Sequence, residues 1–334
     1  MHHVTRLLED NSYVRCLLID FSKAFDVIDH VVLVEKVSKL DIPANILNWL
    51  ISFLTGRTHT SKNGLIESCP QPINRSIIQG SVLGPTLFII FEGDLKPISV
   101  QNVIFKYADD ANLLVPEHTD VQLYEEFQAI KAWAVRNKMI INLSKTKELV
   151  FRRPNPRLHV DIMPVEGIEQ VKEAKLLGVI FSHNLRFDAH VNYILKLCSQ
   201  RGFLLKQFKS QGLSDKQINI VFQALIMSRL TYALAAWSGF LTKELEGRIN
   251  AFLRRMYNLH NCQIQYNIQN LEEQCDKTLF RRMLSESHCL HQLLPSTKNG
   301  QKCLRPRGHN FMLPMCIHEI FKNSFVNRCL YRNA

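Results

Sequence analysis

The sequence lacks the features of a secreted or membrane-spanning protein. Its nine cysteines include no CxxC pair, and residues Met1–Asp10 carry charges instead of the apolar core of a signal peptide. Of the longest apolar stretches, Ser81–Phe91 is too short to cross a membrane, and Val221–Trp237 is interrupted by Gln223 and Arg229. We therefore expect an intracellular chain, in the nucleus or the cytoplasm, with reduced thiols and no membrane partner.

Acidic side chains are outnumbered by basic ones. The 334 residues hold 41 Lys and Arg against 30 Asp and Glu, which gives a formal net charge of +11. This excess favours polyanionic partners such as nucleic acid. Hydrophobic residues make up 46% of the chain, which excludes wholesale disorder, and the length suggests about two packed units. The sequence has no repeat of fixed period and no low-complexity tract.

The first part of the chain alternates between strand and helix patterns. Val14–Asp20 is typical of a buried strand, and Val103–Val115 predicts two short strands folded back on each other. Asp29 is placed to cap one helix, and Pro43 to begin another that runs to about residue 54. Further helices are expected near residues 85–95 and 121–138, a polar hairpin or loop over 56–76, and later strands near 148–152 and 176–181.

After residue 185 long helical patterns dominate, near residues 191–209, 215–237 and 241–257. We therefore predict an α+β domain over residues 1–185, an all-α domain over 186–270 and an extension of unknown role over 271–334. The cysteines and histidines of this extension, Cys303 among them, fit no standard zinc-finger spacing. Buried thiols are expected there instead of a zinc site.

Three carboxylates end or interrupt apolar strands. Asp20 ends the first strand, and Asp109 and Asp110 lie between the later two. Neighbouring carboxylates repel each other at neutral pH, so bringing them together requires protons or cations. Mg²⁺, held by a few carboxylates and by substrate phosphate oxygens, suits such a site. The alternative is turn chemistry at Asp109 and Asp110 and a simple strand end at Asp20, and the pattern alone leaves both interpretations open.

Five short sequence motifs occur around these carboxylates. They are Phe21–Asp26 (FSKAFD), Gln79–Pro85 (QGSVLGP), Tyr107–Asp110 (YADD), Asn142–Lys147 (NLSKTK) and Leu176–Val179 (LLGV). Together they resemble the reverse transcriptase domain of non-LTR (LINE-type) retrotransposons, especially the Jockey-like group, over about residues 12–260.

The resemblance implies a palm domain followed by a helical thumb. It implies an RNA-directed DNA polymerase that extends a DNA primer on an RNA template with deoxynucleoside triphosphates, during retrotransposition. Asp20 and Asp109 would be the principal ligands of two Mg²⁺ ions, for which Mn²⁺ could substitute, and Asp110 would support them. The oligomeric state is left open.

The same resemblance assigns the nucleotide site. Phe21, Phe25, Gln79 and Gly80 would contact the incoming nucleotide, with the ring of Phe25 excluding a ribose 2′-hydroxyl. The alternative for Phe25 is a core anchor, which is compatible with the nucleotide role, and the alternative for Gly80 is a turn residue before a helix. Asp26, Asp29 and His30 of this region are interpreted as capping and packing residues.

The resemblance also assigns basic residues to contacts with phosphate groups of the substrates. Lys145 would protonate or neutralise the leaving pyrophosphate, with a solvated loop lysine as the alternative. The stretch Lys131–Arg157, which includes Arg152 and Arg153, is rich in basic residues and would contact the nucleic-acid backbone.

Further basic residues lie on two predicted thumb helices: Lys196, Arg201, Lys206 and Lys209 on one, and Arg248, Arg254 and Arg255 on the other. The resemblance places Leu177 and Gly178 at the turn that approaches the primer strand. A structural hairpin glycine is the alternative for Gly178.

The chain departs from the family in its N-terminal part, because only 19 residues precede Asp20. A fingers region that grips the triphosphate is expected there, so we expect an N-terminally truncated copy with weak or undetectable activity. The alternative function is a catalytically impaired remnant that only binds nucleic acid. A palm-fold nucleotide cyclase is disfavoured, because it would leave the QGSVLGP word unexplained.

Overall fold

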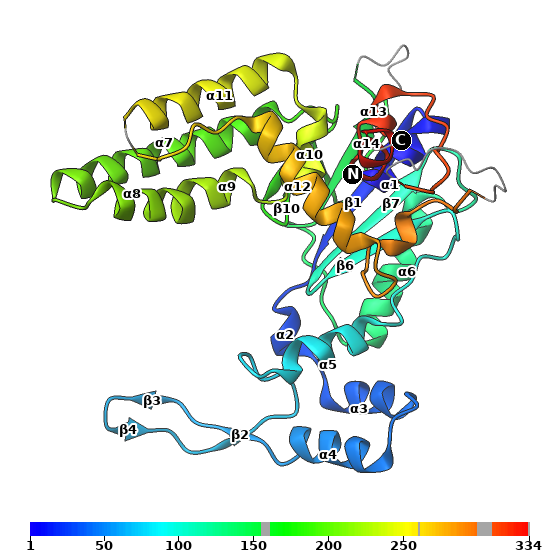
Figure 1. The fold of residues 1–334 in the computed structure, drawn as a ribbon. Helices are drawn as coiled ribbons and strands as arrows, with labels where there is room; N and C mark the ends of the chain where they lie inside the picture. The colour runs from blue at the N-terminus through cyan, green and yellow to red at the C-terminus, as the bar shows by residue number, and fades with distance from the viewer. Residues whose placement is uncertain (155–160, 260, 299–308, 333–334) are drawn as a thin grey trace. The chain divides into compact units, whose positions relative to one another are not determined.

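The computed structural model describes residues 1–154, 161–259, 261–298 and 309–332 (Figure 1). The chain divides into two compact units. Unit 1 comprises Met1–Val14, Phe151–His159 and Lys172–Ala334, and unit 2 comprises Arg15–Val150 and Val160–Val171. The domain boundaries predicted at residues 185 and 270 remain a prediction. Arg157 and Cys303 lie outside the described residues.

Unit 2 is built on a five-stranded sheet with the strand order β6-β7-β1-β8-β9. The strands are β1 (Tyr13–Asp20), β6 (Val103–Tyr107), β7 (Asp110–Pro116), β8 (Lys147–Arg152) and β9 (Glu169–Val171). β6 and β7 form an antiparallel hairpin, whereas β8 and β9 are parallel. The expected α+β class is confirmed, as are the strands predicted at residues 14–20, 103–115 and 148–152.

The helices of unit 2 also follow the predicted pattern. They are α2 (Ala24–Val27), α3 (His30–Ser38), α4 (Ala44–Leu54), α5 (Leu83–Glu92) and α6 (Leu123–Arg136). The Asp29 carboxylate caps α3 by accepting the amides of Val31 and Val32, and α4 begins directly after Pro43. The polar stretch after α4 forms two small hairpins from β2 (Thr58–His59), β3 (Lys62–Asn63), β4 (Ile66–Glu67) and β5 (Gln71–Pro72).

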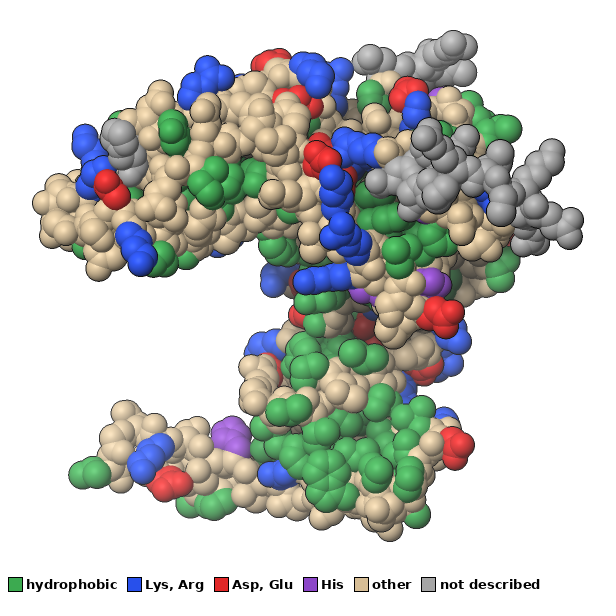
Figure 2. Space-filling view, in the orientation of Figure 1, with side chains coloured by type: hydrophobic (Ala, Val, Ile, Leu, Met, Phe, Trp, Pro, Cys, Tyr) green, Lys and Arg blue, Asp and Glu red, His purple; other side chains and the backbone are tan. Residues whose placement is uncertain are grey.

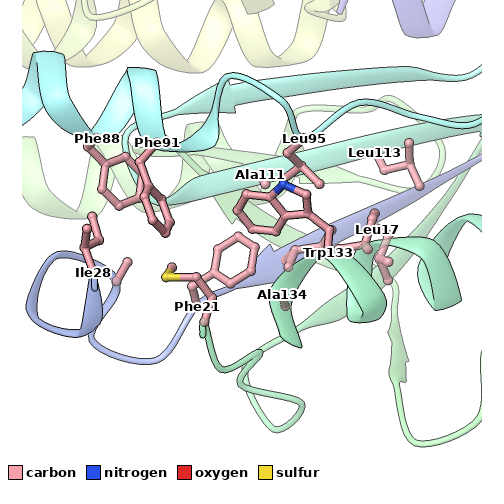
Figure 3. Packing of buried hydrophobic residues seen from close by; sticks show 14 of the residues in the cluster. Leu17, Phe21, Ile28, Phe88, Phe91, Leu95, Ala111, Leu113, Trp133 and Ala134 are labelled. Carbon is pink, nitrogen blue, oxygen red and sulfur yellow. The ribbon is translucent and has the colours of Figure 1, made fainter. Parts of the chain in front are cut away.

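The core of unit 2 lies where α5 and α6 pack on the sheet. Figure 3 shows Phe91 of α5, Trp133 of α6 and Leu17 of β1 directed into this core, and each is under 5% exposed. Burying side chains of this size contributes about 1.5–3 kcal/mol each. The core therefore fixes the end of β1 and the start of β7 on one rigid support.

An apolar surface remains on unit 2 outside this core. Figure 2 shows hydrophobic side chains gathered over α3 and α4. Among them Val31 is 74% exposed, Ile46 44% and Trp49 55%. Apolar patches of this kind are typical of contact surfaces.

Unit 1 is mainly helical. Its elements are α1 (His2–Asp10), the hairpin β10 (Glu173–Leu176) and β11 (Val179–Ser182), α7 (Asp188–Ser210), α8 (Asp215–Phe222), the π-helix η1 (Gln223–Met227), α9 (Ser228–Leu230), α10 (Leu234–Trp237), η2 (Ser238–Phe240), α11 (Lys243–Asn258), α12 (Ile268–Met283), η3 (His291–Leu293), α13 (Glu319–Lys322) and α14 (Phe325–Arg332). The helices predicted at residues 191–209 and 241–257 are confirmed.

Two expectations for unit 1 need correction. Residues 176–181 are not one strand, because the chain reverses at Leu177 and Gly178 between β10 and β11. The helix expected over residues 215–237 contains a π-helical turn and is interrupted near Ala233, whose φ is +50°. In addition, helices α1, α12, α13 and α14 were not predicted.

The helical run Asp215–Phe240 is long and apolar enough to cross a membrane by length and composition alone. This differs from the expectation for Val221–Trp237. The same criterion is met by core helices, and here Phe222, Leu230 and Trp237 are completely buried in the core of unit 1.

A buried ionic network joins α14 to α12. The Arg328 guanidinium donates to both Asp276 oxygens at 2.8 and 2.9 Å and lies 2.9 Å from Glu272 Oε1. Arg332 reaches the same two carboxylates at 3.3 and 2.8 Å. A Cβ at Gly239 would collide with Arg328, so only glycine leaves room there. The network attaches the end of the described chain to the helical core.

Candidate active site

The backbone at the end of β1 is held by the Asn142–Lys147 segment. The amide of Asn142 donates to the Asp20 carbonyl at 2.8 Å, and the Asp20 amide donates to Thr146 Oγ1 at 3.3 Å. Thr146 is completely buried and in turn donates to the Asn142 carbonyl at 2.8 Å. The position of Asp20 therefore depends on a segment more than a hundred residues later in the sequence.

Lys145 of the same segment faces the Asp20 side chain. Its ammonium nitrogen lies 3.9 Å from Asp20 Oδ2, and the two side chains are 69% and 36% exposed. An exposed pair of this kind contributes little stability, at most about 1 kcal/mol. Its consequence is chemical, because it places a proton donor and positive charge beside a predicted metal ligand.

The other two carboxylates lie at the tip of the β6–β7 hairpin. Tyr107 pairs with Asp110, which leaves Ala108 and Asp109 as a two-residue loop. Ala108 has a φ of +51°, a left-handed conformation that costs an L-residue about 1–2 kcal/mol. β7, which begins at Asp110, is the neighbour of β1, which ends at Asp20.

The electrostatics of these carboxylates are coupled. Burial raises the pKa of the Asp110 carboxyl above its ordinary value, and the negative charges of Asp109 and Asp20 raise it further. Within the described residues the only ion pair of this group is that of Asp20 with Lys145. The site therefore holds more negative charge than its surroundings neutralise.

A fourth carboxylate, Glu92, lies at the end of α5, next to β6 of the β6–β7 hairpin. Burial raises the pKa of the Glu92 carboxyl to about 7; the charge of Lys106 opposes this shift and that of Asp109 adds to it. The side chain is almost completely buried, and Oε1 has no hydrogen-bond partner among the described residues. The sequence did not point to Glu92, because this residue lies within an apolar helical pattern.

Two lysines connect the end of α5 to its neighbours. The Lys106 ammonium on β6 donates to the carbonyl oxygens of Glu92 and Leu95 at 2.6 and 3.2 Å. The Lys36 ammonium on α3 donates to the Phe91 carbonyl at 2.6 Å. Positive charge is favourable at a helix C-terminus, where carbonyl groups lack partners. The strand that leads to Asp109 is thus bonded to the helix that begins within the QGSVLGP motif.

Comparison with known proteins decides the family. Residues 2–181 match the family described as reverse transcriptase (RNA-dependent DNA polymerase). The chain belongs to the reverse transcriptase family. Its five-stranded sheet with α5 and α6 is accordingly the palm, and the carboxylates lie at one end of its strands.

Named relatives refine this placement. The chain is 27% identical over 270 residues to the probable RNA-directed DNA polymerase from transposon BS of Drosophila melanogaster, an alignment covering 76% of this chain and 29% of that protein. It is 30% identical over 198 residues to the RNA-directed DNA polymerase from mobile element jockey of Drosophila funebris, covering 55% and 21%. The resemblance to Jockey-like LINE elements is confirmed, and the chain spans under a third of these relatives' length.

Among solved structures, telomerase of Candida tropicalis with a fragment of telomeric RNA is similar to 86% of this chain and to 50% of its own chain, with a TM-score of 0.42 and 13% identity.

Reverse transcriptases generally use divalent metal ions. Among the described residues, no three carboxylate, histidine or cysteine side chains already converge closely enough to hold one ion. The donor set nevertheless fits, because the oxygen ligands of Asp20, Asp109 and Asp110 suit a hard cation, and their mutual repulsion adds to burial in raising the pKa of Asp110. A cation would relieve this repulsion.

The predicted nucleotide residues fall into two groups. Phe25 stacks on Phe88 with ring centroids 4.5 Å apart, and Gln79 Nε2 donates to Asp26 Oδ1 at 2.9 Å. The structure therefore brings Phe25 and the Gln79–Gly80 loop together. Gly80 has a φ of +84° and open space where a side chain would lie.

Phe21 is placed differently. It is only 4% exposed, with its ring 6.0 Å from that of Trp133 in the core (Figure 3). Its side chain is thus a core residue, and only its backbone is available to a nucleotide.

The predicted primer and template residues lie at the β10–β11 turn and at the end of β8. Leu177 and Gly178 form a two-residue turn within unit 1. The Arg153 guanidinium donates to the Leu8 carbonyl at 3.4 Å and contacts His318 Nε2, which favours a structural role for this side chain. The Arg152 amide donates to the His183 carbonyl at 2.7 Å.

Proposed function

We propose that this chain carries out RNA-directed DNA synthesis, with the weak activity that the sequence analysis predicts. The substrates would be an RNA template, a DNA primer and deoxynucleoside triphosphates, as in retrotransposition. The observation that carries the proposal is the coupled, under-neutralised group of Asp20, Asp109 and Asp110 at the ends of neighbouring palm strands of a reverse transcriptase.

Two Mg²⁺ ions, with Mn²⁺ as a substitute, are proposed as cofactors held by Asp20 and Asp109 with Asp110 in support. When bound, such ions lower the pKa of the attacking primer 3′-hydroxyl and stabilise the charge of the leaving pyrophosphate.

The chain's own residues supply positioning and charge. The Asn142–Lys147 segment holds the Asp20 backbone, so that the carboxylate is oriented before substrate arrives. Lys145 brings an ammonium to the same place and would neutralise negative charge as pyrophosphate leaves. Phe25, stacked on Phe88, offers a rigid ring beside the Gln79–Gly80 loop for selecting a deoxyribose.

We also propose an intracellular location. No cysteine among the described residues forms a disulfide, and burial raises the pKa of the Cys16 thiol to about 12. A buried thiol whose ionisation is suppressed in this way is unreactive, which supports a reducing compartment.

Primer extension tests the polymerase proposal. A labelled DNA primer annealed to an RNA template is incubated with the chain, Mg²⁺ and deoxynucleotides. Asp109→Asn should reduce extension at least about a hundredfold, because a charge aimed at the reacting centre is lost. The exposed Asp41→Asn is the matched control and should extend like the wild type.

The nucleic-acid-binding alternative has a distinct signature. A wild-type chain that binds the primer–template with a steep dependence on salt, but extends it in neither Mg²⁺ nor Mn²⁺, would overturn the polymerase proposal and favour the alternative.

A further inference from the structure

The turn between β10 and β11 has an unusual backbone. Leu176 pairs with Val179, so that Leu177 and Gly178 alone make the turn, and their φ values are +45° and +84°. A two-residue hairpin turn with both φ values positive favours Asn-Gly or Gly-Gly. Leucine in the first position costs about 1–2 kcal/mol. The turn therefore needs support from outside the hairpin to keep one conformation.

Tyr232 supplies this support. Its hydroxyl donates to the Leu177 carbonyl oxygen at 2.9 Å. Its ring lies against Gly178, because a Cβ built there would be 3.2 Å from Tyr232 Cε1. One side chain thus contacts both residues of the turn, and Gly178 is required by the backbone and by the ring together.

The backbone of Tyr232 is itself anchored. The preceding Thr231 donates from Oγ1 to the Met227 carbonyl at 2.9 Å, and the buried Trp237 donates from Nε1 to the Tyr232 carbonyl at 3.1 Å. The interruption of the helical run at Ala233, with a φ of +50°, directly follows. The broken helix holds the tyrosine at a fixed place beside the hairpin.

This contact lies at the surface and outside the core beneath the hairpin. Tyr232 is 52% exposed and Leu177 42%, whereas Val179, which packs into the core of unit 1, is 4% exposed. On β10 the Lys175 ammonium lies 3.1 Å from the Tyr193 hydroxyl and 4.7 Å from its ring centroid. The turn and its tyrosine therefore face solvent beside a positive charge, as a phosphate backbone requires.

We propose that Tyr232 is a positioning residue, which holds the Leu177–Gly178 turn in the one conformation that the turn presents to the primer strand. This inference rests on the proposed function, since it takes the primer strand as the ligand of the turn. A hairpin held in advance loses less conformational entropy on binding, which slows dissociation of the primer.

The test compares two substitutions with a matched control. Tyr232→Phe removes only the hydroxyl, Tyr232→Leu also removes the ring, and Tyr257→Phe changes another exposed tyrosine of unit 1. Affinity for a fluorescent RNA–DNA primer–template is measured by anisotropy without nucleotide. Hydrogen exchange of residues 173–182 is measured without nucleic acid.

The expected result separates positioning from stability. Tyr232→Phe should weaken primer–template binding about fivefold and Tyr232→Leu about tenfold, with faster exchange in the hairpin. The Km for deoxynucleotide and the melting temperature should stay at wild-type values, and Tyr257→Phe should bind like the wild type. If Tyr232→Leu does not fold, Tyr232→Phe decides.

Wild-type affinity in both Tyr232 variants, or a loss of thermal stability without a loss of affinity, would overturn the positioning role alone. A wild-type chain that binds the primer–template without extending it would overturn the proposed function, and the affinities would still decide the role of Tyr232. A wild-type chain that does not bind at all would overturn both.

Discussion

The two units differ in how far the charge of their clustered carboxylates is neutralised. In unit 1, Glu272 and Asp276 are enclosed by Arg328 and Arg332, which satisfy their charge within the chain. In unit 2, the group around Asp20 has one exposed lysine as its ion-pair partner among the described residues. The first arrangement holds helices together, whereas the second leaves negative charge for a bound cation. Acidic clusters are therefore informative only together with their neutralising partners.

The largest expected loss of stability comes from removing Arg328 from its ion pairs with Glu272 and Asp276. Arg328→Met should lower the free energy of unfolding of unit 1 by about 3–5 kcal/mol, because Asp276 and Glu272 stay buried without their main partner. Urea denaturation measures the loss. The exposed Arg281→Met on α12 is the control and should stay within about 0.5 kcal/mol of the wild type. A loss below about 1 kcal/mol at Arg328 would show that Arg332 alone neutralises the cluster.

The second prediction concerns Glu92, a buried carboxylate whose Oε1 has no hydrogen-bond partner among the described residues. Its pKa is raised from 4.5 to about 7 in the folded chain, so stability is highest with Glu92 protonated and falls as the pH rises from about 4.5 through 7. The fall should be about 3 kcal/mol. Glu92→Gln should remove this part of the pH dependence, which is measured by urea denaturation at pH 5 and pH 8. An equal stability difference between the two proteins at both pH values would contradict the prediction.

The third prediction concerns Lys145, the exposed lysine beside the proposed catalytic carboxylates. Lys145→Met should reduce the rate of primer extension about tenfold or more, because the ammonium near Asp20 is lost. If its charge is what matters, Lys145→Arg should recover most of the rate. Single-turnover extension measures both, with the exposed Lys39→Met as control. A wild-type rate in Lys145→Met would leave this lysine a solvated loop residue.

The smallest effect separates two glycines, one from each unit. Gly80 and Gly178 share a φ of +84°, but a Cβ at Gly80 meets open space and one at Gly178 meets Tyr232. Gly80→Ala should cost about 1 kcal/mol from backbone strain, and Gly178→Ala somewhat more. Thermal unfolding of the two variants gives the comparison. Equal losses would mean that the tyrosine ring moves aside without cost.

The palm was predictable because its signals are local. A buried strand that ends at Asp20, a capping Asp29 and a proline before α4 each act within a few residues, and each predicted the observed element. The words around the carboxylates also identified the family. The ring of Phe21 enters the core, whereas the ring of Phe25 stacks on Phe88 at the edge of the core. The sequence pattern could not show this difference, because both residues are phenylalanines.

The rest depends on partners that are distant in the sequence. Arg328 is buried only because Asp276 lies 52 residues before it, and Tyr232 meets Leu177 across 55 residues. Composition predicts neither pair. Helices α12 and α14 are held together by such contacts, which their sequence patterns do not reveal. The strand pattern over residues 176–181 did not show the reversal at Leu177, because a leucine rarely occupies a positive φ, whereas the family resemblance placed a turn at Leu177 and Gly178.

The way α1 is held has a consequence for synthesis on the ribosome. The Glu9 carboxylate accepts the amide of Ile317, which follows 308 residues later. During translation α1 is therefore made before its partner, and residues 15–150 of unit 2 are complete before Ile317 is added. Throughout that interval its apolar residues Val4 and Leu8, both buried in the finished fold, are available to chaperones.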